Sequence, residues 1–153
     1  MAGTKRVCGG CTACCKTHPI VELNKPARSW CPECEIGKGC KIYGNHPQGC
    51  LDFACQWLLG GGAEEERPDK VKIVVDYLVL PTFGETTMVH EVTEGALKNL
   101  FAQRVLKRRI GMGKPVCFLP INGNNTLYVP RKGLTLYRKF GRINDRDTDI
   151  VYV

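Results

Sequence analysis

The stretch CGGCTACC, residues 8–15, decides how the first third of this chain is organised. Nine of the ten cysteines lie between Cys8 and Cys55. Two cysteines separated by two residues can close on one metal ion, with each sulfur about 2.3 Å from it. This density of thiols predicts a metal-binding module instead of an ordinary apolar core.

The same spacing returns in CPEC, residues 31–34, and single cysteines follow as far as Cys55. Glycine and proline are frequent between them, which suits a backbone that wraps round metal ions and donates amide hydrogens to sulfur. The predicted metal ligands are Cys8, Cys11, Cys14, Cys15, Cys31, Cys34, Cys40, Cys50 and Cys55.

The adjacent pair Cys14 and Cys15 indicates at least two metal ions, because neighbouring side chains in an extended segment point in opposite directions. Eight thiolates would complete two separate four-sulfur sites, either zinc ions or iron–sulfur clusters. Nine thiolates would hold three tetrahedral ions if three of the sulfurs bridge two ions each. The sequence leaves these arrangements and the identity of the metal open.

A disulfide scaffold is the main alternative for a cysteine-rich segment. Residues 1–10 lack the apolar core of a secretory signal, no later segment has the length of a membrane span, and nine is an odd number of thiols. We therefore expect reduced thiols, a cytoplasmic location and no membrane partner.

Composition divides the chain into two unequal modules. Residues 1–59 hold the cysteines but few aliphatic side chains, so metal binding would have to supply much of their folding free energy. Residues 60–69, rich in glycine and acidic residues, form the expected linker. Residues 70–153 have the patterning of an ordinary folded module.

The second module is expected to be a small unit of β-β-α-β-β order, which makes the fold class α+β. Period-two patterns predict the strands, and the spacing of Leu97, Leu100, Phe101 and Val105 predicts a helix that ends at Gly111. The expected strands are 71–80, 85–93, 114–121 and 126–131, the helix is 95–110, and 134–140 and 150–153 are candidate edge strands. Turns are expected at 81–84 and at the sequence NGNN, residues 122–125.

The formal charge of +7 invites a nucleic-acid interpretation. That count treats every thiol as neutral, and two zinc ions on eight thiolates or three on nine would reduce it to about +3 or +4. The basic residues are also dispersed, and 107–109 fall where cations stabilise a helix C-terminus. Nucleic-acid binding is therefore disfavoured.

A string of motifs resembles a known family. In order these are CxxCxxCC at 8–15, ELNKP at 22–26, WCPEC at 30–34, GCKIY at 39–43, P47-x-x-C50 and FACQWL at 53–58. They resemble the CxxCxxCC cysteine-cluster family, described as zinc- or iron-chelating proteins. Some members of that family are labelled iron–sulfur oxidoreductases, and the domain occurs in a flagellin lysine N-methylase associated with an iron–sulfur cluster.

Two histidines are candidates for hydrogen bonding to the thiolates or for binding metal. His46 stands where the family often has Arg, four residues before Cys50, and His18 follows Cys15 by three residues. His90 falls in a predicted strand, where a structural role is expected. Cys117 is expected to be a small buried hydrophobic residue and not a ligand.

Three functions remain in competition. The first is a cytoplasmic metal-binding protein whose nine-cysteine cage holds two or three zinc ions or iron–sulfur clusters. The second is an iron–sulfur redox or methylation accessory protein, and the third is a zinc-stapled adaptor for nucleic acid or for a protein partner. The chain contains no dinucleotide-binding, P-loop, radical-enzyme or HExxH motif, so nothing beyond the cage indicates catalysis.

Overall fold

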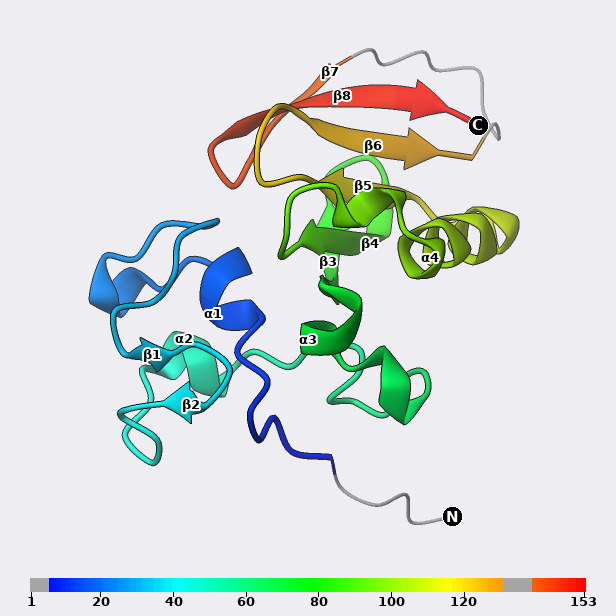
Figure 1. The fold of residues 1–153 in the computed structure, drawn as a ribbon. Helices are drawn as coiled ribbons and strands as arrows, with labels where there is room; N and C mark the ends of the chain where they lie inside the picture. The colour runs from blue at the N-terminus through cyan, green and yellow to red at the C-terminus, as the bar shows by residue number, and fades with distance from the viewer. Residues whose placement is uncertain (1–5, 131–138) are drawn as a thin grey trace.

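A computed structural model of the chain describes residues 6–130 and 139–153. The fold is α+β, as expected, and its main element is a curled six-stranded sheet with the strand order β3-β4-β5-β6-β8-β7. The cysteine-rich segment lies beside the first strands of this sheet, and β6, β7 and β8 lie at the far end (Figure 1). None of the helices in the described ranges has the length and apolar character needed to cross a bilayer.

The cysteine-rich segment consists of short elements joined by turns. They are α1 (Cys14–Thr17), the 3₁₀ helix η1 (Val21–Leu23), the hairpin strands β1 (Cys34–Glu35) and β2 (Gly39–Cys40), and α2 (Gln48–Leu51). Segments this short carry little stability of their own, so their shape depends on what they pack against and on what the thiols bind.

The first hairpin of the sheet pairs β3 (Ile73–Leu80) with β4 (Gly84–Glu91), antiparallel, with Leu80 opposite Gly84. The turn expected at 81–84 is confirmed, and both Thr82 and Gly84 adopt positive φ there. Strand β5 (Val116–Leu119) runs parallel to β4 and pairs with β6 (Asn125–Val129) through the expected turn, in which Gly123 has a φ of 88°.

Alternation along the strands gives the sheet two different faces. One face packs against α4 (Leu100–Gly111) through a buried cluster that includes Ile73, Val89, Val105 and Val116. The opposite face buries two further clusters. The first holds Leu80, Met88, Cys117, Leu119, Leu127 and Ile143, and the second joins Val74 and Val92 to Ala13, Cys55 and Trp57.

The second of these clusters joins the cysteine-rich segment to the sheet. Trp57 is buried against Val74, and the amide of Gln56 donates a hydrogen bond of 2.7 Å to the carbonyl of Val75. The two expected modules therefore share an apolar contact and a backbone hydrogen bond. Whether residues 1–59 can unfold separately stays a prediction.

The segment 60–69, expected as a linker, is folded into η2 (Glu64–Glu66) and the first part of α3 (Pro68–Val71). The Arg6 guanidinium donates to the carbonyls of Trp57, Gly61 and Gly62, and the indole N–H of Trp57 donates to the Ala63 carbonyl. These bonds tie the segment to Trp57.

The expected helix begins later than its apolar pattern suggested. A 3₁₀ turn, η3 (Ala96–Lys98), comes first, and then the Asn99 side chain caps α4 by accepting from the Ala102 amide at 2.9 Å. Leu100, placed on the buried face by its spacing, is 81% exposed because it opens the helix on the solvent side. The left-handed residue beyond the end is Gly113, with a φ of 76°, and not Gly111.

The C-terminal strands form a hairpin that the sequence analysis missed. Strands β7 (Lys139–Ile143) and β8 (Arg146–Tyr152) are antiparallel, and the turn residues Asn144 and Asp145 both have positive φ. Strand β8 also runs parallel to β6. Of the candidate edges, 150–153 falls in and just beyond β8, whereas most of 134–140 lies outside the described residues.

Candidate metal centre

The nine N-terminal cysteines gather in two neighbouring groups. The first contains Cys8, Cys11 and Cys55, and it lies where the cysteine-rich segment meets the sheet. Burial raises the pKa of Cys8, and the nearby thiols of Cys11, Cys55 and Cys15 raise it further. The first group is therefore close enough for its thiolates to repel one another.

Backbone amides point at two sulfurs of this first group. Cys11 accepts from the amides of Ala13 and Asp69, and Cys55 accepts from those of Trp57 and Leu58. Burial nevertheless raises the pKa of both thiols. Amide hydrogens directed at sulfur favour the thiolate, the form that binds metal.

The second group contains the remaining six cysteines: Cys14, Cys15, Cys31, Cys34, Cys40 and Cys50. The thiol of Cys15 is hydrogen-bonded to those of Cys14 and Cys34, and the bond to Cys14 is the main reason that the pKa of Cys15 is raised. Cys34 lies opposite Cys40 in the β1–β2 hairpin, and the Cys31 amide donates to the Cys15 carbonyl at 3.0 Å.

The pair Cys14 and Cys15 opens a short helix, which differs from the extended segment assumed in the sequence analysis. Successive helical residues do not point in opposite directions, and these two thiols are hydrogen-bonded to each other. The expectation of at least two metal ions therefore loses this support, and it now rests on the number of thiols and their two groups.

The loops that carry the two groups approach each other closely. A Cβ on Gly10 would lie 3.1 Å from the Gly37 carbonyl oxygen, so only glycine fits without a shift there. The Thr12 hydroxyl accepts from the Gly37 amide at 3.0 Å and is hydrogen-bonded to the Cys34 sulfur. Burial, with Cys15 beside it, raises the pKa of Cys34 to about 12.

A buried lysine faces the second group. Lys25 is 4% exposed, and its ammonium donates to the carbonyls of Lys16 and His18. Burial lowers its pKa, while the nearby thiols of Cys14, Cys15, Cys31 and Cys50 act in the opposite direction. A buried ammonium beside four thiols favours their ionised form.

All ten cysteines lie in the described ranges, and none of them is in a disulfide. In those ranges only one set of three His, Cys, Asp or Glu side chains has its ligand atoms all within 4.8 Å of one another, and it contains no cysteine. The nine thiols are thus gathered into two groups, but they are not closed into a four-sulfur site.

The set without cysteine consists of His18, Asp76 and His90, and it is called the triad below. The Nε2 atom of His18 lies 3.1 Å from Oδ2 of Asp76, and Nε2 of His90 lies 2.7 Å from Oδ1 of the same carboxylate. The two imidazole rings are 4.3 Å apart between centroids, and the Phe53 ring lies 4.2 Å from that of His18, tilted by 43°. His18 follows α1, whereas Asp76 and His90 project from β3 and β4.

Two members of the triad, Asp76 and His18, have shifted pKa values. Burial alone would raise the pKa of Asp76, but the hydrogen bonds from His18 and His90 outweigh it and hold that pKa well below its ordinary range. Burial lowers the pKa of His18, and His90 adds to that effect. From the sequence, His18 is expected near the thiolates and His90 in a structural role; the structure brings both onto the carboxylate of Asp76.

The other two sequence candidates have simpler surroundings. His46 stacks edge-on against Tyr43, with ring centroids 5.0 Å apart. Cys117 is fully buried in the core of β5, and burial raises its pKa to about 12, which agrees with the expected apolar role. It belongs to the same buried cluster as Met88, Leu119 and Leu127.

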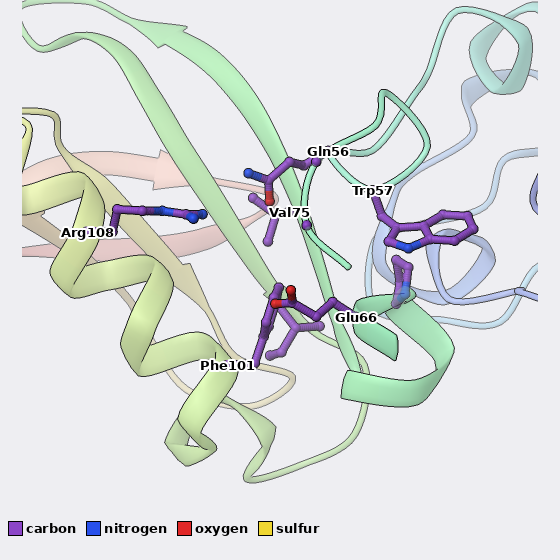
Figure 2. Close-up of a pocket in the computed structure, with 10 residues that line it drawn as sticks. Gln56, Trp57, Glu66, Val75, Phe101 and Arg108 are labelled. Atoms are coloured by element: carbon purple, nitrogen blue, oxygen red, sulfur yellow. The ribbon is translucent and has the colours of Figure 1, made fainter. Parts of the chain in front are cut away.

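A pocket lies between α4, β3 and the segment that follows Trp57. Figure 2 shows Arg108 reaching from α4 toward Gln56 and Val75, with Phe101 and Glu66 beside each other on another wall. Neither the nine N-terminal cysteines nor the triad line it. The candidate metal ligands of the chain therefore lie outside this pocket.

Comparison with protein-family models, with curated proteins and with solved structures gave no significant match. The resemblance to the CxxCxxCC family therefore remains a matter of the motifs alone.

Proposed function

We propose that this chain is a metal-binding protein whose nine N-terminal cysteines hold two or three zinc ions or iron–sulfur clusters. The observation that carries the proposal is the gathering of nine reduced thiols from distant positions into two adjacent groups. Disulfides would require thiols to pair, whereas these thiols share several neighbours each.

The surroundings of the sulfurs support this function. Amides aimed at Cys11 and Cys55, a hydroxyl bonded to Cys34 and the buried ammonium of Lys25 are the groups that stabilise thiolates around a metal. Soft sulfur donors of this kind select zinc or iron–sulfur clusters over calcium and magnesium. The donor set therefore fits either of the two expected metals.

Burial makes metal binding and folding interdependent in this segment. Because burial raises the pKa of Cys8, Cys11, Cys34, Cys50 and Cys55, these thiols are protonated at neutral pH unless a cation displaces the protons. Metal binding should therefore release protons and order residues 1–59.

Anaerobic purification followed by metal and sulfide analysis tests the proposal. A colourless protein with stoichiometric zinc supports a zinc-binding protein, and a brown protein with acid-labile sulfide supports iron–sulfur clusters. The double variant Cys31→Ser/Cys34→Ser should lose metal, whereas the matched control Cys117→Ser, which changes only the sheet core, should keep it. Metal-free wild-type protein with all thiols titratable would contradict the proposal.

If the protein is brown, the iron–sulfur redox or methylation accessory function becomes the leading form of the proposal. Reversible bleaching by a reductant would support an electron-transfer role, since a zinc site cannot change oxidation state. If zinc is found, salt-dependent binding to nucleic acid would favour the adaptor alternative.

A further inference from the structure

We infer that His18, Asp76 and His90 form a binding site for a divalent transition-metal ion, zinc or ferrous iron, separate from the proposed cysteine cage. Two imidazoles and one carboxylate are brought together, Asp76 and His90 from the β3–β4 hairpin and His18 from the distant segment that follows α1. No sulfur is part of this set.

The distances between the ligand atoms suit a metal ion. A tetrahedral zinc ion bound at about 2.0–2.1 Å holds neighbouring ligand atoms roughly 3.3 Å apart. Nε2 of His18 lies 3.1 Å from Oδ2 of Asp76, and Nε2 of His90 lies 2.7 Å from Oδ1 of the same carboxylate. One ligand atom from each of the three residues gives a set in which all three atoms lie within 4.8 Å of one another. These separations are close to those around a bound ion, although one of the two hydrogen bonds is shorter than the ligand spacing of zinc.

The ring of His18 is held from both sides. Its Nε2 atom faces Asp76, and its Nδ1 atom lies 2.7 Å from the hydroxyl of Thr17, which is itself buried. With a metal on Nε2, the ring would donate Nδ1–H to that hydroxyl, the outer-shell bond that orients metal-binding histidines. Phe53 lies against the ring and limits its rotation.

The sheet presents the other two ligands on one face. Val74 is opposite His90 and Asp76 is opposite Met88, so Asp76 and His90 are diagonal neighbours on adjacent strands. His90 is 6% exposed at its side chain, whereas those of His18 and Asp76 are 18% and 19% exposed. The site is thus anchored in the sheet and open on the side of His18.

Charge and ligand number indicate the class of ion. Two neutral imidazoles and one carboxylate carry a charge of about −1, which a divalent cation overcompensates and a bound hydroxide could balance. Three protein ligands leave at least one position for water, as in catalytic zinc sites and in non-haem iron sites with two histidines and one carboxylate. The same set offers too few oxygens for calcium.

Histidine-selective NMR of the zinc-saturated full chain tests the site without any substitution. The chain has three histidines, so the ring nitrogens give three resolvable spin systems. We expect the rings of His18 and His90 to show metal-bound shifts. Free-imidazole shifts for His18 and His90 at saturating zinc would overturn the inference.

Two variants separate a metal site from a purely structural hydrogen-bond network. In His90→Gln the amide can still donate to Asp76, but the imidazole ligand is gone. Cys117→Ser is the control, because Cys117 is a buried residue of the neighbouring strand β5 and is not among the proposed ligands. Native mass spectrometry should show one zinc ion fewer in His90→Gln, with affinity for that ion at least about 10-fold weaker, and an unchanged count in Cys117→Ser. Equal counts in His90→Gln and wild type would contradict the site.

The double variant Cys31→Ser/Cys34→Ser distinguishes this site from the proposed cage. If it loses thiolate-bound metal while His18 and His90 keep their metal-bound shifts, the two sites are independent. Cys55→Ser adds a further check, because Cys55 is the thiol on which Asp76 acts electrostatically. Loss of the metal-bound shifts of His18 and His90 in this variant would assign Cys55 as a fourth ligand and overturn the separation.

Discussion

Trp57→Ala tests the contact between the cysteine-rich segment and the sheet. The indole is 6% exposed, and it lies in the buried cluster with Ala13, Cys55, Val74 and Val92. Its N–H donates to the Ala63 carbonyl at 3.1 Å, and the Arg6 guanidinium stacks over its ring at 4.7 Å. Phe53 packs against the same cluster but is only partly buried.

The expected loss follows from these contacts. Truncating a buried aromatic side chain to Ala costs about 3–5 kcal/mol, because it removes apolar burial and leaves a cavity. Trp57→Phe keeps most of the ring but removes the N–H, so it should cost the hydrogen bond, about 1 kcal/mol, and a part of the packing. The two variants thus separate packing from hydrogen bonding.

Urea unfolding followed by far-ultraviolet circular dichroism, at saturating zinc, measures the change in unfolding free energy. Trp30→Phe is the matched control, because Trp30 lies outside the cluster and its ring contacts the Lys16 ammonium at 5.6 Å. We expect the control to cost no more than about 1 kcal/mol. A loss below about 1.5 kcal/mol for Trp57→Ala would refute the packing of the two parts through this residue.

Three further predictions concern the thiol groups. Lys25→Met should weaken metal retention by about 10-fold or more in a competition titration. The substitution removes the buried charge beside four thiols and two hydrogen bonds to backbone carbonyls. An unchanged affinity would show that Lys25 has only a structural role. His46→Ala should weaken metal retention by about 10-fold if the imidazole reaches a thiolate, with His46→Arg tolerated, whereas equal affinity for His46→Ala and wild type would make His46 an ordinary loop residue in contact with Tyr43. A strong chelator should remove hydrogen-exchange protection from residues 1–59 but leave it in the sheet of 70–153, and uniform loss along the chain would mean that the two parts unfold together.

Part of the sheet could be predicted from local sequence. The turns at 81–84 and 122–125 follow from their residue types, and both hairpins form as expected. The Asn144–Asp145 hairpin was missed because its turn lacks the glycine of the commonest signals, although Asn and Asp tolerate the positive φ that both residues adopt. The late start of α4 depends on the Asn99 cap, which apolar spacing does not reveal.

Only two of the three residues of the triad could be paired from the sequence. Given the turn at 81–84, the register of the hairpin places Asp76 and His90 as diagonal neighbours, so these two could have been paired from the sequence. His18 could not, because it reaches Asp76 across 58 positions through the docking of α1 on the sheet. That docking depends on the buried cluster around Trp57, a long-range contact with no local signal.

For the cysteines too, the sequence predicts the kind of site but not its arrangement. Their number and spacing predict a metal-binding segment, but which thiols lie together depends on how the loops at Gly10 and Gly37 pack. The assumption that Cys14 and Cys15 lie in an extended segment was wrong because they open α1. Groups of this kind are defined by tertiary contacts and not by distance along the chain.

Native mass spectrometry of the full chain, purified without oxygen and never exposed to chelator, tests the proposed thiolate centre most directly. The proposed cage predicts at least two metal ions per chain, in addition to any ion held by the triad. The ions of the cage should be lost in Cys31→Ser/Cys34→Ser or in variants of the Cys8, Cys11 and Cys55 group. A chain that carries no metal, or whose only metal survives the loss of these cysteines, would contradict it.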